Sequence, residues 1–226
     1  MLLPPRPTTD RTISASERAR RIATPEAQRL LVAARKLIAR RGAGAANINA
    51  IAAECGLAGT SLLYHFGTKG RLLVELLRQG HERLAGLLNV ELRGAAAPAE
   101  AAASIARVLE GYLPEAREGD RLGVVAEATG RAAGNREVAL LLGQERAYAA
   151  AAITRELAAC PAATRAAPPE QVAALIVVVV DGAAALPPGS GGALTQDALT
   201  RIFAALLVPW PETTSAPEAE ASGALG

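Results

Sequence analysis

The side chains best suited to recognition chemistry gather between residues 47 and 69. They carry amide, hydroxyl, imidazole and ammonium groups, at Asn47, Asn49, Thr60, Ser61, Tyr64, His65 and Lys69. Amides and hydroxyls can bond base edges or phosphates in a nucleic-acid groove, and an ammonium attracts phosphate by its charge. Whether these groups act together depends on the helices that hold them.

Two short helices joined by a tight turn are predicted to position these groups. The first begins at Asn47, whose side-chain oxygen can accept from a free amide of the opening turn. Its apolar positions recur at helical spacing, at Ile48, Ile51, Ala52 and Cys55. Gly56 can take the left-handed backbone of a sharp reversal, and Leu57 can fill the angle between the helices. A second helix follows from about Gly59 to Phe66, so the pattern predicts a DNA-reading helix-turn-helix.

The segment from Arg29 to Leu77 resembles the DNA-binding domain of TetR-family transcriptional regulators. Residues 29–42 resemble the first helix of that domain with its closing glycine, and residues 51–57 resemble the second helix and the turn. Residues 62–66, Lys69 and Leu72-Leu73 resemble the third helix and the start of the fourth. The resemblance implies an all-α protein, in which an N-terminal three-helix helix-turn-helix domain precedes a larger helical domain for ligand binding and dimerisation.

The sequence departs from the family pattern where bases are read. Leu63 stands where the family usually has tyrosine, Tyr64 follows one place later, and Ala58-Gly59 replaces a serine and a basic or polar residue. Leu63 can touch a thymine methyl group or can pack on the domain core, and the sequence leaves both alternatives open.

Thr60, Ser61 and Tyr64 are predicted on the outward side of the reading helix, Asn49 near the DNA backbone, and Gly59 where close approach is needed. His65 and Lys69 match family positions that touch phosphate, although His65 can instead be a polar residue that bridges the third and fourth helices. The predicted DNA-binding set is Asn47, Asn49, Gly59, Thr60, Ser61, Leu63, Tyr64, His65 and Lys69.

Charge supports the same interpretation independently of the resemblance. Residues 1–83 contain 14 Lys and Arg against 6 Asp and Glu, a balance of +8, whereas residues 84–226 contain 10 against 16, a balance of −6. The two balances sum to the +2 of the whole chain. A basic front segment suits a polyanion, and an acidic remainder repels it.

An enzyme is not expected, and neither a catalytic residue, a cofactor nor a metal is predicted. The two histidines, His65 and His81, show no nucleophile, metal-binding spacing or carboxylate partner nearby in the sequence, and no phosphate-binding glycine loop follows a strand pattern. Cys55 and Cys160 fall in different predicted modules. The alternative from another class is a helical protein-interaction module with a nonspecific basic surface.

Composition and the positions of glycine and proline predict the organisation of the 226 residues. Hydrophobic residues make up 50%, aromatic residues only 3%, and no period-two alternation competes with helix. We expect a disordered basic arm over residues 1–23, the helix-turn-helix domain over 24–70, the effector and dimerisation domain over 71–208, and a disordered tail over 209–226. Thr24 and Asn135 are expected to cap helices, and later helices are expected at about 99–117, 121–132, 135–159, 168–186 and 195–208.

The family resemblance implies two partners for the second domain, a small-molecule effector and a second copy of the chain. Binding of the effector is expected to release the protein from its operator, which would make it a repressor. Candidate polar groups for the ligand are Tyr112, Arg121, Glu127, Arg131, Tyr148 and Asp181. The helices at about 169–186 and 195–208 are expected to pair with their copies in a homodimer, unless both are buried within one monomer. A twofold dimer suits a near-palindromic double-stranded operator. The opening residues lack the apolar run of a signal peptide, and the apolar stretch Val172–Val180 is shorter than the roughly 20 residues of a membrane span, so a cytoplasmic protein without membrane contact is expected.

Overall fold

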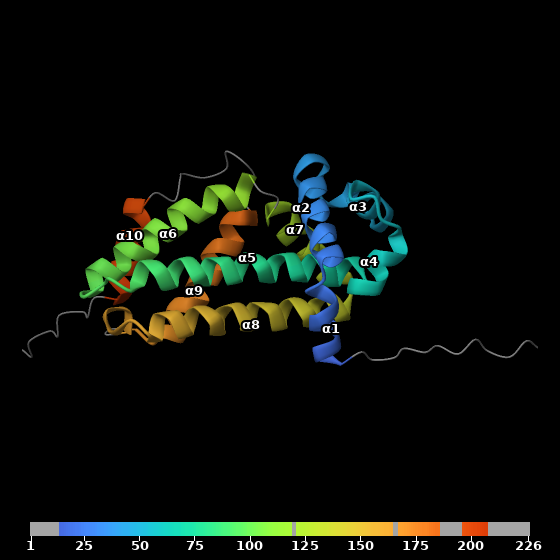
Figure 1. Cartoon of the computed structure of the whole chain (residues 1–226). Helices are drawn as coiled ribbons and strands as arrows, with labels where there is room; N and C mark the ends of the chain where they lie inside the picture. The colour runs from blue at the N-terminus through green and yellow to red at the C-terminus, as the bar shows by residue number, and fades with distance from the viewer. Residues whose placement is uncertain (1–13, 119–120, 165–166, 186–195, 208–226) are drawn as a thin grey trace, which may run out of the picture.

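The computed structural model describes residues 14–118, 121–164, 167–185 and 196–207, and these are almost entirely helical, with no strand among them. The helices run in the order α1 (Ala15–Ile22), α2 (Pro25–Ala45), α3 (Ile48–Glu54), α4 (Gly59–Phe66), α5 (Lys69–Leu92), α6 (Pro98–Glu118), α7 (Arg121–Gly134), α8 (Arg136–Ala158), α9 (Pro169–Ala185) and α10 (Gln196–Leu207), with a short 3-10 helix at Pro161–Thr164. Figure 1 shows α2, α3 and α4 clustered at one end of the long helix α5. The predicted all-α class is confirmed.

Side-chain caps explain where several helices begin. Thr24 Oγ1 accepts from the amide of Ala27 at 3.2 Å, and Asn47 Oδ1 accepts from the amide of Ala50 at 2.9 Å. Asn135 Oδ1 accepts from two amides in the first turn of α8, at 3.0 and 3.2 Å. Each satisfies helix-end amides that have no partner within the helix. These three predicted caps are confirmed, and the later helices begin and end within one or two residues of the predicted bounds.

Glycines with positive φ make the sharp reversals around α3 and α4. Gly56 has φ of 70° at the turn after α3, and Gly67 has φ of 75° at the end of α4. Only a residue without a Cβ adopts this backbone at little cost. The predicted role of Gly56 is therefore confirmed, and the two glycines bracket α4.

Two apolar cores lie along α5. The first contains Leu30, Leu62 and Phe66 with Leu72, Leu73, Leu76 and Leu77 of α5, and it also takes in Val124, Val125 and Ala128 of α7. The second begins at Leu84 and joins α5 to α6, α8, α9 and α10. The predicted division between residues 70 and 71 thus falls inside one continuous helix, and α7 packs against the DNA-binding domain as well as against α8.

The prediction that residues 1–23 form a disordered arm is wrong for the second half of this range. Residues Ala15–Ile22 form α1, with Ser14 Oγ accepting from the amide of Glu17 at 3.1 Å. Arg21 and Glu17 form an ion pair across one turn, at 3.0 Å. Arginine-rich composition suggested an arm, but a serine cap and contacts with α4 stabilise a helix instead. Residues 1–13 of the predicted arm, and the predicted tail from residue 209, lie outside the described residues.

The last two helices are only partly covered. In α9, Val172, Ile176 and Val180 are fully buried, whereas Val178 is 65% exposed. In α10, Leu199 and Phe203 pack against α6, whereas Ile202 is 41% exposed. Helix α9 is apolar almost all round, and its own chain therefore leaves part of this apolar surface uncovered. Among the described helices, none has the length and apolar character needed to cross a bilayer.

Candidate nucleic-acid interface

Helix α4 presents one buried and one outward face. Leu62 is fully buried and Phe66 nearly so, which seats the helix on the first core. Thr60, Leu63 and Tyr64 are exposed and Ser61 is half-buried. The outward face thus combines hydroxyl groups with one leucine on an α-helix, an element that the major groove is wide enough to admit.

Leu63 does not pack on the core. Its side chain is 45% exposed, while its neighbour Leu62 fills the core position. Of the two alternatives that the sequence left open, the structure favours a leucine available to a partner.

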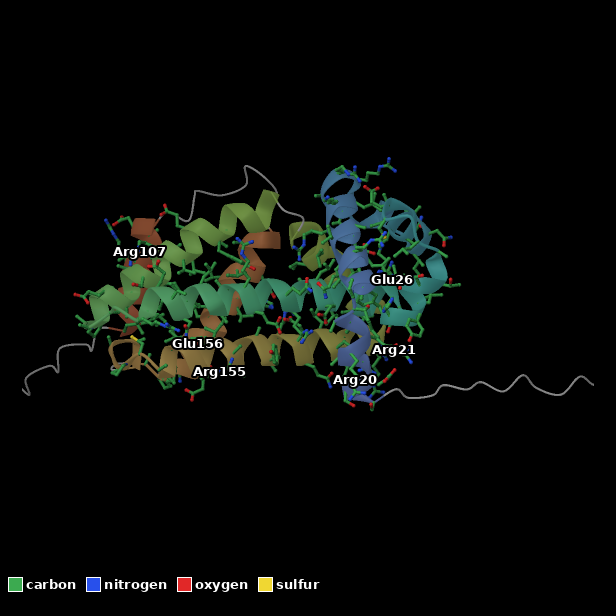
Figure 2. The ribbon with its side chains drawn as sticks, in the orientation of Figure 1. Arg20, Arg21, Glu26, Arg107, Arg155 and Glu156 are labelled. Atoms are coloured by element: carbon green, nitrogen blue, oxygen red, sulfur yellow. The ribbon has the colours of Figure 1, made fainter. Side chains whose placement is uncertain are left out.

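Tyr64 is held by α1. The guanidinium carbon of Arg21 lies 4.5 Å from the centre of the Tyr64 ring, and Arg21 Nη1 donates to the Tyr64 carbonyl at 3.2 Å. Figure 2 shows Arg20 and Arg21 on α1, at the end of the molecule where α4 lies. Arg21 was expected only as part of a mobile arm, because sequence spacing alone does not show contact between residues 43 positions apart. The contact restrains Tyr64 while leaving its ring 58% exposed.

Asn47, Asn49 and Gly59 lie where α3 meets α4. Asn47 and Asn49 are exposed, and Gly59 is half-buried. A Cβ built on Gly59 would collide with Oδ1 of Asn49. Because Oδ1 is the movable end of an exposed side chain, this contact alone does not require glycine, and the close approach to DNA at Gly59 stays a prediction.

His65 faces inward. It is only 3% exposed, and its Nδ1 donates to the Arg21 carbonyl at 3.0 Å. Its Nε2 lies 3.4 Å from Glu26 Oε2 at the start of α2. The ring therefore joins α4 to the junction of α1 and α2, not to the following helix α5 as the bridging alternative had it, and it places no imidazole nitrogen toward solvent.

Lys69 is also buried, with 8% of its surface exposed. Its Nζ donates to Oε1 of Glu127 on α7 at 2.9 Å, and Arg131 Nε donates to the same oxygen at 2.7 Å. Burial raises the pKa of the Glu127 carboxyl, but the hydrogen bonds and charges of Lys69 and Arg131 outweigh this and leave the pKa below its ordinary value. The site residue expected at a phosphate thus contacts the second domain in this structure.

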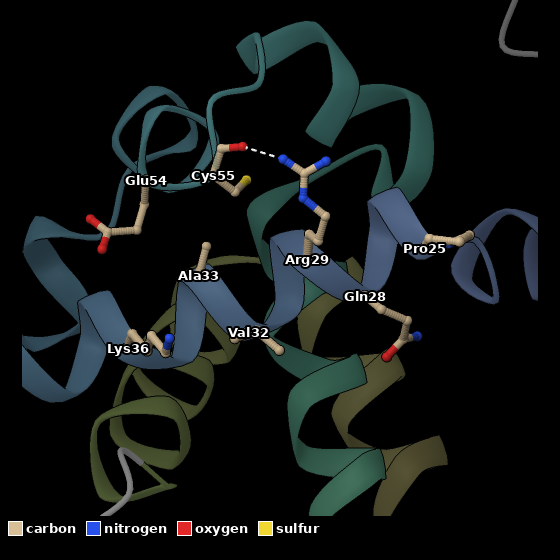
Figure 3. Close-up of a pocket in the computed structure, with 8 residues that line it drawn as sticks. All are labelled: Pro25, Gln28, Arg29, Val32, Ala33, Lys36, Glu54 and Cys55. Atoms are coloured by element: carbon tan, nitrogen blue, oxygen red, sulfur yellow. Dashed lines mark hydrogen bonds between the residues drawn. The ribbon is translucent and has the colours of Figure 1, made fainter.

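A groove of about 480 Å³ lies beside the helix-turn-helix, between α2 and the end of α3. Figure 3 shows Arg29 crossing it toward Cys55, and its Nη2 donates to the Cys55 carbonyl at 2.6 Å. The rest of the lining is Pro25, Gln28, Val32, Ala33, Lys36 and Glu54. Arg29 thereby satisfies a carbonyl at the end of α3 and ties the turn to α2.

The predicted ligand residues do not form one cluster. Glu127 and Arg131 bond to each other near Lys69, as described above. Tyr112 is buried and its hydroxyl donates to the Gly80 carbonyl at 2.8 Å, whereas Tyr148 is 48% exposed and donates to Glu82 at 3.2 Å. Asp181 lies on α9 and accepts from Arg146 Nε of α8 at 3.0 Å. The side chain of Arg121 lies outside the described part of the chain.

His81 has the carboxylate partners that the sequence did not show. Its Nδ1 lies 2.6 Å from Glu145 Oε1, and its Nε2 lies 3.5 Å from Asp181 Oδ1, whose other oxygen accepts from Arg146 Nε at 3.0 Å. Both ring nitrogens face carboxylates, so two N–H groups are needed unless a carboxyl is protonated. Sequence spacing did not reveal these partners, because Glu145 and Asp181 lie 64 and 100 positions further along the chain.

Known proteins share both the motif and the fold. Residues 30–76 match the family model described as bacterial regulatory proteins, tetR family. The multidrug binding protein EbrR, in a crystal structure with imidazole, is 25% identical, with a TM-score of 0.63 over 86% of this chain and 95% of that chain.

More distant structures share the fold. A TetR-family regulator from Rhodococcus sp. is 19% identical, with a TM-score of 0.63 over 80% of this chain and 98% of that chain. AibR, solved with isovaleryl coenzyme A and operator DNA, is 16% identical, with a TM-score of 0.53 over 82% and 100%. None of the curated proteins matches the chain significantly. The matched motif over residues 30–76 and the shared helical fold thus support a DNA-binding transcriptional regulator of the TetR type.

Proposed function

We propose that the protein is a homodimeric repressor that reads a near-palindromic operator with α4 and leaves it when a small molecule binds the helical domain. The observation that carries the DNA-reading part is the outward face of α4. Thr60, Ser61, Leu63 and Tyr64 point away from the core while Leu62 and Phe66 anchor the helix. Hydroxyls and a leucine can discriminate bases by hydrogen bonds and by contact with thymine methyl groups.

Dimerisation is supported by the uncovered apolar face of α9 and α10. Val178 and Ile202 are large apolar side chains left exposed on helices that each bury one face in the second core. A second copy of the same helices would cover both residues around a twofold axis. Two copies of α4 would then stand about 34 Å apart, the spacing of successive major grooves.

Ligand release is supported by the described relatives. EbrR is a multidrug binding protein solved with imidazole, and AibR was solved with both an acyl coenzyme A and operator DNA. In this chain α7 packs into the core of the DNA-binding domain and also against α8 and α9. A ligand that binds one arrangement of these helices more tightly than the other would shift the position of α4.

The experiment is selection of genomic fragments on the purified protein, followed by titration of the enriched duplex and a scrambled duplex at low and moderate salt. We expect a palindromic site whose advantage over the scrambled duplex persists at moderate salt. Tyr64→Ala should remove that advantage, while Leu140→Ala, which alters an exposed leucine on α8, should keep it. Binding that ignores sequence and disappears with salt would contradict the proposal and favour the protein-interaction alternative.

A further inference from the structure

The first turn of α5 connects the two domains through two ion pairs. Lys69 contacts Glu127 of α7, and Arg71 contacts Glu137 of α8 at 2.6 Å. Between them, Gly70 lies so close to Val138 that a Cβ would come within 2.7 Å of its Cγ2. The turn that follows the DNA-reading helix is therefore packed directly against the second domain.

The two ion pairs differ in burial. Lys69 is 8% exposed and Glu127 20%, whereas Arg71 is 31% and Glu137 48% exposed. A buried ammonium interacts more strongly with its carboxylate than a solvated one, because less water screens the charges. The depressed pKa of Glu127 means that this carboxylate is ionised at neutral pH.

The ion pair between Lys69 and Glu127 can open without leaving the Glu127 carboxylate unpaired. Oε1 of Glu127 also accepts from Arg131 at 2.7 Å, so the carboxylate keeps one cationic partner when Lys69 leaves. Lys69 is the first residue of α5, next to the exposed Gly67 and Thr68, and its four-carbon stem is flexible. An ammonium at a helix start is well placed for phosphate, because the free amides there also favour an anion.

We propose that Glu127 competes with DNA phosphate for the Lys69 ammonium, so that α7 sets DNA affinity by holding or releasing this one side chain. The inference rests on the proposed function and adds the regulation of that DNA-binding surface. Motion of α7 away from α5 releases Lys69 and favours DNA, whereas the packing seen here withholds it. Glu127 acts through Lys69 as a positioning residue and does not itself touch DNA.

The test is titration of the selected operator and of a scrambled duplex over a series of salt concentrations. Glu127→Gln should tighten binding to both duplexes by about fivefold. It should also steepen the salt dependence by about one released counterion. Glu137→Gln is the matched control, because it removes the same charge and also breaks an ion pair to the first turn of α5. It should change affinity by less than about twofold.

Two further variants keep the inference testable. Glu127→Asp keeps the net charge of the protein but shortens the side chain, which weakens the contact with Lys69. It should therefore tighten DNA binding as Glu127→Gln does, and a change in net charge could not explain the gain. In the Lys69→Met background, Glu127→Gln should have no effect on affinity. Thermal unfolding of each variant without DNA establishes that it is folded.

The outcomes separate this inference from the proposed function. Weaker binding by Glu127→Gln, a gain equal to that of Glu137→Gln, or a gain that persists in Lys69→Met would each overturn the competition. If the parent protein does not distinguish the operator from the scrambled duplex, the proposed function itself is wrong. If the parent distinguishes them and the variants do not differ, only the competition is wrong.

Discussion

On α4 the polar side chains of Thr60, Ser61 and Tyr64 face outward, whereas between α5, α8 and α9 the polar side chains of His81, Glu145 and Asp181 bond to one another. The first group is available to an external partner, because solvent is the main competitor for its hydrogen bonds. The second group is already engaged within the chain. The comparison shows that residue type alone does not separate a binding surface from an internal network, since burial and partners make the difference.

The largest effect is expected from His81→Leu, which breaks the internal network. Without the imidazole, the buried Glu145 loses its contact with His81 Nδ1, and Asp181 loses its contact with Nε2. We expect unfolding free energy to fall by about 3–5 kcal/mol, measured by urea denaturation. Glu82→Gln, which affects a half-exposed carboxylate nearby on the same helix, should cost less than about 1 kcal/mol. A comparable loss in both variants would mean that burial does not distinguish the two sites.

The next largest effect concerns the apolar face that the chain leaves uncovered. Val178→Asp on α9 should dissociate the dimer, because a charge would be buried without a partner at the contact. Val90→Asp on α5 is the matched control, since the two valines are 65% and 66% exposed. Sedimentation velocity should show a monomer for the first variant and a dimer for the second. A dimer that tolerates both changes places the interface elsewhere.

A moderate effect is expected from removing one hydroxyl of the reading helix. Ser61→Ala should change preference among operators with single base-pair substitutions by about 1–3 kcal/mol, if Ser61 bonds a base edge. Binding to a scrambled duplex should stay the same, because the neutral hydroxyl adds little to charge attraction. Anisotropy titrations over a panel of substituted operators measure this. A uniform loss across the panel would assign Ser61 to the phosphate backbone instead.

The smallest effect is the contribution of Glu127 to stability against acid. Its pKa is lowered in the folded protein, so its stabilising contribution is complete above its ordinary value of 4.5 and is lost as pH falls through the folded value. The difference in unfolding free energy between the parent and Glu127→Gln should therefore shrink below about pH 4.5, measured by denaturation from pH 7 to pH 3. A difference that is constant over this range would contradict the shift.

Much of the DNA-binding domain could be predicted because its signals are local. Asn47 and Gly56 act on backbone groups within a few residues, and Leu62 and Phe66 lie on the same face because of helical spacing. The positions of His65 and Lys69 could not be predicted in this way. Their partners Glu26 and Glu127 lie 39 and 58 positions away, and only the packing of α2 and α7 brings them close.

The sequence by itself determined the helices from α2 onward, the caps at Thr24, Asn47 and Asn135, the turn at Gly56 and the outward face of α4, because these depend on hydrogen bonds and spacing within one or two turns. The tertiary structure alone decided that Arg21 stacks on Tyr64, that His81 lies between two carboxylates and that Lys69 pairs with Glu127. Each of these contacts joins residues from different helices, and the packing of the apolar faces that brings those helices together is a property of the whole chain.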